Sequence, residues 1–571
     1  SAGQSGENAA TYISGVNQNG EVFTLSGGVA NNFILNDGGY HYVAAGGSSL
    51  NLTQNGGYIN ADVAKDGANI NTYINGVNQS GIAMALSNGE AENFIINKGS
   101  QRVSSGGITV STVLNNSSYQ YVGPGGTASS TAVHSEAEQH ISSGGAAYGA
   151  VLSGFSAYQI ISEGGQAQES VLNSGAMQYV LSGGYASRAE INSGASQVIS
   201  FGGYAYGAQI NSGGVQYIST GGYVDSSYVN ERANQAIESG ATATNTVLAS
   251  GAKLNVFAGG SSLNVIQNSG ANINASIGAG SEYAGTYITG TNEDGNDFML
   301  SGSVASGFII NAGGMQLVDL GGSAVDTVIN SNGYQNISAG GSSLNVTQNA
   351  GGNIDVIVGQ DSANAGTYVS GVNQDGADLS LISGVASNFI VNSGGSHTVL
   401  SGGKSLDVVI NSGGNIYAVV AKDEANINTY VSGINQEGAE LTLSGGVASN
   451  FIVNYFGKQI ISSGGEAYDT IVNADGQQWI SDGGSAYNAQ INEGGVQQIS
   501  AGGYANNTDL KGLQIISAGG SADATAINGG IQKISGGTAE TTLINSGSQF
   551  IYAGGSAIGT QVASGGYQIV D

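Results

Sequence analysis

Residues 210–222 read Ile-Asn-Ser-Gly-Gly-Val-Gln-Tyr-Ile-Ser-Thr-Gly-Gly, and variants of this sequence recur along the chain. The paired glycines mark the recurrence most clearly, because successive pairs are 17 to 20 residues apart. A fixed period of about 19 residues is typical of a solenoid, in which each repeat forms one coil. One run of pairs begins at Gly144, Gly164, Gly183, Gly202 and Gly221, and a second begins at Gly464, Gly483, Gly502, Gly519, Gly536 and Gly554.

Each repeat contains short apolar alternations bounded by Gly, Ser and Asn, which predicts brief strands and tight turns rather than helices. The alternation of apolar and polar residues is clear at residues 208–210, where Ala208 and Ile210 would face one side of a strand and Gln209 the other. Coils stacked at the strand spacing of about 4.8 Å would place equivalent side chains above one another. We therefore expect apolar columns of Ile191, Ile210 and Val229 and of Ile199 and Ile218, and an amide ladder of Asn192, Asn211 and Asn230 at a turn.

These patterns predict an all-β protein, a parallel β-solenoid of about 28–30 coils that forms a rod on the order of 130–150 Å long. The composition excludes several other classes. The 571 residues include 98 Gly but one Pro, so the chain is not a collagen, and the absence of Cys excludes disulfides and thiol catalysis. With 11 basic and 39 acidic residues, the formal charge of −28 argues against nucleic acid and anionic membranes as partners.

A longer unit is superposed on the short repeat. It begins at Thr11, Thr72, Thr286, Thr367 and Thr429, and each copy has a turn-forming pair between two alternating segments. Such pairs predict five β-hairpins that interrupt the coils and protrude from the rod. Their tips are candidate contact sites, although they could equally serve only to cap or bend the rod. The predicted tip residues are Asn19, Gly20, Ser80, Gly81, Asp294, Gly295, Asp375, Gly376, Glu437 and Gly438.

The two kinds of unit divide the chain into four regions within one elongated solenoid, residues 1–571. Two hairpin-bearing units fall in residues 1–124, and three more fall in residues 259–458. Regular ladders of plain coils are expected at residues 125–258 and 459–571. The first twenty residues have no pattern of a signal peptide, and no apolar segment is long enough for a membrane helix.

The repeat at Ile210 to Gly222, found again at Ile491 to Ala505, resembles the repeat of AIDA-type autotransporter adhesins. The longer Gly-x-Asn-x-x-Gly-x-x-x-x-Leu-Ser-Gly unit resembles the interrupting segment of their self-associating members. This resemblance implies a right-handed β-helix, secreted as a passenger by a Gram-negative bacterium and either tethered to the outer membrane or released. It also implies that any membrane contact is made through a C-terminal translocator barrel, which these residues do not include.

The resemblance further implies roles in adhesion, autoaggregation and biofilm formation. We expect an extracellular, non-enzymatic protein without a cofactor, whose main partner is another copy of itself. A glycan or protein on a host or bacterial surface is a second class of partner. The alternative function is a passive stalk or fibre subunit that displays another domain. Some family members carry O-linked heptose on repeat serines, represented here by Ser193, Ser200 and Ser212.

Enzymes and metal sites are the weaker interpretations. A polysaccharide-active β-helix would need a groove where Asp or Glu converges with a basic residue, but the only arginines, Arg102, Arg188 and Arg232, are several coils apart in the sequence. His134 and His140 lack a metal-ligand pattern. Calcium-loop motifs also fail, which leaves only diffuse cation binding through the acidic charge. Recurrent Tyr residues predict an aromatic column on the sheet or, as an alternative, a sugar-stacking surface.

Overall fold

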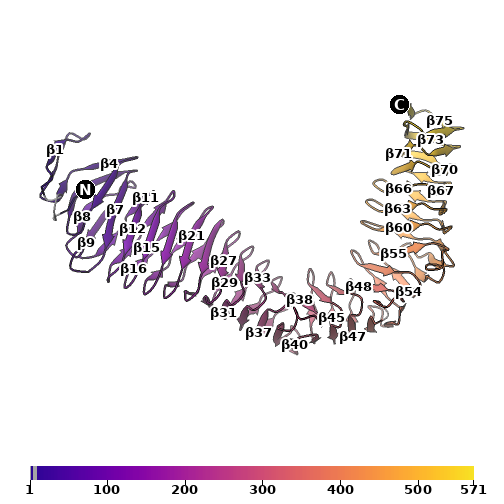
Figure 1. Cartoon of the computed structure of the whole chain (residues 1–571), viewed down its shortest axis with the longest axis horizontal. Helices are drawn as coiled ribbons and strands as arrows, with labels where there is room; N and C mark the ends of the chain where they lie inside the picture. Colours follow the sequence, from indigo (N-terminus) through magenta and orange to yellow (C-terminus); the bar gives the residue numbers. More distant parts are fainter. Residues whose placement is uncertain (1, 4–9, 365) are drawn as a thin grey trace. The chain divides into compact units, whose positions relative to one another are not determined.

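The computed structural model describes residues 2–3, 10–364 and 366–571. All the regular elements in these residues are β-strands, as the repeat predicts. None of the described residues forms a helix long and apolar enough to cross a membrane. The contacts divide the chain into two compact units, Ser1–Ile273 with Gly285–Asp297, and Asn274–Ala284 with Phe298–Asp571. Both units are built from stacked coils of short strands (Figure 1).

A coil of the first unit contains three strands, exemplified by β28 (Tyr204–Tyr206), β29 (Gln209–Ile210) and β30 (Val215–Ile218). The next coil repeats them as β31 (Tyr223–Asp225), β32 (Tyr228–Val229) and β33 (Asn234–Ile237). Each strand pairs in parallel with its counterpart, so that Tyr204 lies opposite Tyr223 and Ile210 opposite Val229. The register therefore advances by one repeat per coil, which confirms the predicted parallel β-solenoid.

The predicted interior columns are also present. Ile191, Ile210 and Val229 are completely buried, whereas Gln209 on the opposite face of its strand is exposed. Ile199 and Ile218 form the second column and are equally buried. At the turn after β29, the Nδ2 of Asn211 donates to the Oδ1 of Asn192 at 2.8 Å, and Asn230 donates to Asn211 at 2.9 Å. The amide ladder predicted from the sequence is thus confirmed.

A second amide ladder lies inside the core, where the sequence analysis did not place one. Gln216 is completely buried on the same side of β30 as Ile218, and Tyr217 between them faces solvent. The Nε2 of Gln216 donates to the Oε1 of Gln197 at 2.7 Å, and the Oε1 of Gln216 accepts from the Nε2 of Gln235 at 2.7 Å. The ladder runs through Gln101, Gln120, Gln139, Gln159, Gln178, Gln197, Gln216 and Gln235, and a similar one runs through Gln459, Gln478, Gln497, Gln514, Gln532, Gln549 and Gln568.

Hydroxyl groups from another wall of the coil join this ladder. The Oγ of Ser227, between β31 and β32, donates to the Oε1 of Gln216 at 3.1 Å. Thr246 donates in the same way to Gln235, eleven residues earlier in the sequence. The Oε1 of Gln216 therefore accepts one bond along the stack, from Gln235, and one across the coil, from Ser227. A buried polar group is tolerated in an apolar core when it is paired in this way.

The two glycines of the repeat have different roles at the corner after β30. Gly221 has a φ of 74°, in the left-handed region that glycine adopts without a steric penalty. Gly222 is required for space, because a Cβ there would lie 2.6 Å from the carbonyl oxygen of Ile199 in the preceding coil. The pair thus combines a tight turn with a close approach between coils.

His397 occupies the ladder position of its own repeat, since it follows Asn392 at the same interval as Gln216 follows Asn211. The side chain is completely buried, with its Nε2 2.9 Å from the Oγ of Ser405 and its ring 5.2 Å from that of Phe389. Burial lowers the pKa of His397 to about 4. The core at this point therefore holds a neutral imidazole.

Replacing Gln216 with Leu is expected to destabilise the fold by about 1–3 kcal/mol, because it leaves the amide of Gln235 and the carbonyl of Gln197 without their buried partners. The measurement is the urea midpoint followed by circular dichroism. Gln209→Leu is the matched control on the exposed face and should change stability by less than about 0.5 kcal/mol. Equal midpoints for the two variants would contradict a structural role of the ladder.

His397 is expected to make the fold less stable in acid. Histidine in an unfolded chain titrates near pH 6.5, so the unfolded state binds a proton more tightly than the folded state. The stability contribution of the neutral ring is complete above about pH 6.5 and is lost as the pH falls towards 4, by on the order of 3 kcal/mol in total. Burial raises the pKa of Asp355 to about 6, which acts in the opposite direction.

The contribution of His397 is therefore measured as a difference between two proteins. Stability of the wild type and of His397→Gln would be compared by urea unfolding from about pH 4 to 8. The gap between their stabilities should narrow or reverse in favour of Gln as the solution becomes acidic, since only the wild type loses the histidine contribution. Parallel curves across this range would show that His397 does not cause the acid sensitivity.

Candidate functional site

The five longer units form antiparallel strands at the predicted places. Three strands pair in sequence in four of the units: β1 (Ile13–Val16), β2 (Val22–Ser26) and β3 (Val29–Asn31); β8 (Tyr73–Val77), β9 (Ala83–Ser87) and β10 (Glu90–Glu92); β49 (Tyr368–Val372), β50 (Asp378–Ile382) and β51 (Val385–Ser387); and β56 (Tyr430–Ile434), β57 (Glu440–Ser444) and β58 (Val447–Ser449). The third unit along the chain likewise has three strands, since β40 (Asp297–Ser301) pairs with β39 (Tyr287–Thr291) and, antiparallel, with β41 (Val304–Ser306).

These hairpin strands are also rungs of the solenoid wall. β49 pairs in parallel with β47 (Ser342–Gln348) of the preceding coil, and β51 pairs in parallel with β54 (Lys404–Ile410) of the following coil. β50 lies between β49 and β51 in the same sheet. The strands of this hairpin are thus fixed by hydrogen bonds on both sides, and only its turn extends free of the ladder.

One asparagine holds each turn in shape. In the fifth hairpin the Oδ1 of Asn435 accepts from the backbone N–H groups of Glu437 and Ala439 at 3.0 Å, and its Nδ2 donates to the carbonyl of Asn450 at 2.9 Å. The equivalent residues make the same turn bonds in the other copies: Asn17, Asn78, Asn292 and Asn373. This role was not predicted from the sequence, although an Asn three residues before the tip glycine recurs in all five copies.

The predicted tip residues all lie in these turns. Their side chains are exposed at Asn19, Ser80, Asp294, Asp375 and Glu437. The glycines that follow have φ values of 76° to 82°, and a Cβ would meet no atom within 4 Å, so glycine is favoured there by backbone conformation alone: Gly20, Gly81, Gly295, Gly376 and Gly438. Contact between these tips and a partner remains a prediction.

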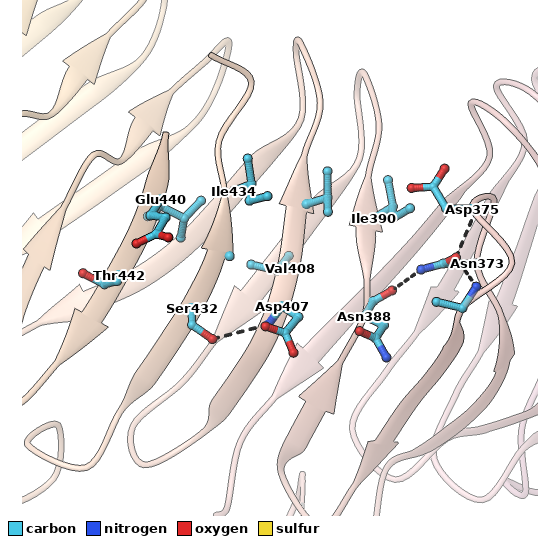
Figure 2. Close-up of a pocket in the computed structure, with 14 residues that line it drawn as sticks. Asn373, Asp375, Asn388, Ile390, Asp407, Val408, Ser432, Ile434, Glu440 and Thr442 are labelled. Atoms are coloured by element: carbon cyan, nitrogen blue, oxygen red, sulfur yellow. Dashed lines mark hydrogen bonds between the residues drawn. The ribbon is translucent and has the colours of Figure 1, made fainter. Parts of the chain in front are cut away.

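A groove of about 510 Å³ lies between the fourth and fifth hairpins (Figure 2). Its floor includes Val408 and Val409 of β54 and the half-exposed Ile434 of β56. Three carboxylates, from Asp375, Asp407 and Glu440, are among the lining residues, and no Lys or Arg lines it. The described residues thus form a surface groove with an apolar floor and an acidic border.

A second groove, of about 590 Å³, meets the geometric criterion set for a polysaccharide-active site, because Glu169, Arg188 and Glu190 all line it. The Nη1 of Arg188 is 3.4 Å from the Oε1 of Glu169, but these side chains are 64% and 59% exposed. A pair this exposed is largely solvated and contributes little energy. Catalytic groups are expected instead to be perturbed by burial and neighbouring charges. The arrangement has the properties of an ordinary surface ion pair.

The remaining predicted residues lie apart from one another. Arg102 is exposed, and Arg232 is 3.5 Å from Glu231 in a solvated pair. His134 contacts Ser153, whereas His140 contacts Glu138. Within residues 2–3, 10–364 and 366–571, no three His, Cys, Asp or Glu side chains are arranged to hold a metal ion.

Tyrosines stack along the walls in more than one column. Tyr185, Tyr204 and Tyr223 form a run with ring centroids 5.4 Å apart, as an aromatic column requires. Tyr217 does not join it, because it belongs to β30 in a different sheet. The serines proposed as glycan acceptors are on the surface, with Ser193 and Ser212 exposed and Ser200 half-buried. Their modification remains a prediction.

Comparison with known proteins identifies the repeats. The family model described as "Adhesin of bacterial autotransporter system, probable stalk", named AIDA, matches residues 289–352 and 432–495. This confirms the resemblance to AIDA-type adhesins. Both AIDA segments include a hairpin-bearing unit followed by plain coils. No curated protein sequence matches the chain.

Solved structures that are similar to the chain include the following two. One is the crystal structure of a TibC-catalysed hyper-glycosylated fragment of TibA, which is 23% identical, covers 77% of this chain and 98% of its own, and has a TM-score of 0.22. The other is a variant of the PL6-family alginate lyase AlyGC, which is 9% identical, covers 84% of this chain and 96% of its own, and has a TM-score of 0.20.

Substituting Asn435 with Ala is expected to loosen the fifth hairpin, because three hydrogen bonds are lost while the solenoid wall is kept. The free energy of local opening should fall by about 1–3 kcal/mol. Hydrogen exchange of the peptide that covers residues 430–449 measures this change. Glu437→Ala, at the exposed tip, is the matched control and should leave the exchange rates unaltered. Slow exchange in both variants would contradict the role of Asn435.

Proposed function

We propose that the chain is the passenger of an extracellular autotransporter adhesin, and that copies on neighbouring bacteria bind each other side by side. Such contacts would produce autoaggregation and biofilm formation. The AIDA match supports the adhesin class, and that class is exported to the bacterial cell surface. Contact with a host or bacterial glycan or protein is the second mode of adhesion. No catalytic step is part of this proposal.

The observation that carries the proposal is the repetition of equivalent surface groups at one coil spacing. The turn ladder that includes Asn192, Asn211 and Asn230, together with the exposed turn serines, presents the same polar groups many times along one edge. Two such edges can form many weak hydrogen bonds at once when they lie alongside each other. Individually weak contacts then add up to a strong attachment between cells.

The charge of the chain shapes how this association depends on salt. At a formal charge of −28, two copies repel each other over long distances. The screening length falls from about 30 Å at 0.01 M salt to about 8 Å at 0.15 M. Lateral contact is therefore favoured near physiological ionic strength and opposed at low salt.

Sedimentation of the purified chain across protein and salt concentrations tests the proposal, with a chelated sample as the control for calcium. We expect reversible association that increases with protein concentration and is stronger at 0.15 M than at 0.01 M salt. Association only when calcium is present would point to cation bridging instead. A chain that stays monomeric at high concentration would favour the passive stalk or an adhesin for a different surface.

A further inference from the structure

One turn of the second unit departs from the repeat. The regular sequence Asn-Ser-Gly-Gly, as at residues 211–214, is replaced by Asn-Tyr-Phe-Gly at residues 454–457. Tyr455 and Phe456 are 59% and 72% exposed, and their ring centroids are 4.0 Å apart. Two adjacent aromatic side chains thus project from a corner where other coils have Ser and Gly.

The backbone at this turn is strained by the substitution. Phe456 has a φ of 57°, and it is the one aromatic residue with a positive φ among the residues that the structure describes. The equivalent position in other repeats is Gly213 or Gly413, with φ values of 77° and 80°. A bulky side chain in this conformation costs energy that glycine does not, and such strain concentrates at functional sites.

The turn is nevertheless held rigidly. Strand β55 (Asn415–Val420) supplies Asn415, whose Nδ2 donates to the carbonyl of Tyr455 at 2.9 Å, and Tyr417, whose hydroxyl donates to the carbonyl of Phe456 at 2.7 Å. Aromatic groups that are exposed and already ordered lose little conformational entropy on binding. Such groups are typical anchors of protein interfaces.

A cation lies in the next strand. β60 (Lys458–Ile461) begins two residues after Phe456, and the Nζ of Lys458 is 2.8 Å from the ring centroid of Trp479, the only tryptophan of the chain. The surface that contains Tyr455, Phe456, Lys458 and Trp479 therefore combines three aromatic side chains with one ammonium group, in a protein with 11 basic residues against 39 acidic ones. We call these four residues the aromatic corner.

The groove between the fourth and fifth hairpins has the complementary chemistry. Its apolar floor, with Ile434 46% exposed, can receive aromatic rings, and the carboxylates of Asp375, Asp407 and Glu440 can attract an ammonium group. Its volume of about 510 Å³ is within the range of pockets that enclose small organic groups. Neither Tyr455 nor Phe456 lines the groove of its own chain.

We infer that the aromatic corner of one copy docks into the groove between the fourth and fifth hairpins of a second copy. This inference rests on the proposed self-association and adds one specific pair of surfaces to the repeated edge contacts. Since the corner and the groove are different surfaces, the contact is heterologous: a pair bound in this way still presents a free groove on one copy and a free corner on the other. Repeated contacts of this kind add further copies rather than closing at two.

Replacing the turn with the repeat's own residues provides the first test. The double variant Tyr455→Ser with Phe456→Gly should fold at least as stably as the wild type, because it restores a turn that other coils use. Its association, measured by sedimentation velocity, should be at least tenfold weaker. Phe201→Ala is the matched control, since Phe201 is also 72% exposed but lies in a plain coil, and it should associate as the wild type does.

Mixing two variants tests the heterologous geometry. Ile434→Lys should block the groove while keeping the corner, and the double variant keeps the groove but lacks the corner. At a protein concentration at which the wild type is mainly associated, each variant alone should be mainly monomeric, and their mixture should form one-to-one pairs that do not grow. Circular dichroism of each variant verifies that the fold is retained.

The outcomes separate the inference from the proposed function. If the wild type associates and the double variant associates equally, or if Phe201→Ala weakens association as much, the docking inference is overturned and lateral adhesion stands. A mixture that stays monomeric likewise overturns it. If the wild type itself does not associate, the proposed function fails as well.

Discussion

The structure depends on one constraint: a polar group buried in the core must find its partner one coil above or below. Gln216 satisfies it through Gln197 and Gln235, and Ser227 supplies a further donor from another wall. An amide buried without such partners costs more than a paired amide contributes. The ladder therefore links the side chains of successive coils to one register, and the parallel pairing of β28 with β31 and of β30 with β33 follows the same step.

The regular part of this fold could be predicted because the sequence repeats what the structure stacks. Burial of Ile210 and exposure of Gln209 follow from the alternation of a short strand, and the turn ladder at Asn211 follows from its recurrence. The core position of Gln216 could not be found in this way, since alternation alone does not say whether a glutamine faces inward with Ile218. Gln recurs at that position in successive repeats, but such a recurrence is equally compatible with a row of exposed glutamines on a polar surface.

The candidate site was predictable only in outline. Turn-forming pairs such as Asp375-Gly376 locate the hairpins. The groove, however, is formed by two hairpins together with the strand β54 between them, and its lining residues span more than sixty residues of the sequence. The aromatic corner departs from the repeat, so a search for the repeat passes over it. A residue such as Phe456 is informative because the regular coils have glycine at the same turn position, so the fold itself does not require an aromatic residue there.

The turns of the solenoid absorb differences in repeat length without disturbing its interior. Gln497 and Gln514 are 17 residues apart and Gln139 and Gln159 are 20 apart, yet both pairs share the same amide bond, at 2.6 Å and 2.7 Å. A whole repeat can thus be gained or lost by gene duplication or deletion while the remaining coils keep their amide hydrogen bonds to adjacent coils. The length of such a solenoid would then evolve in discrete steps of one coil.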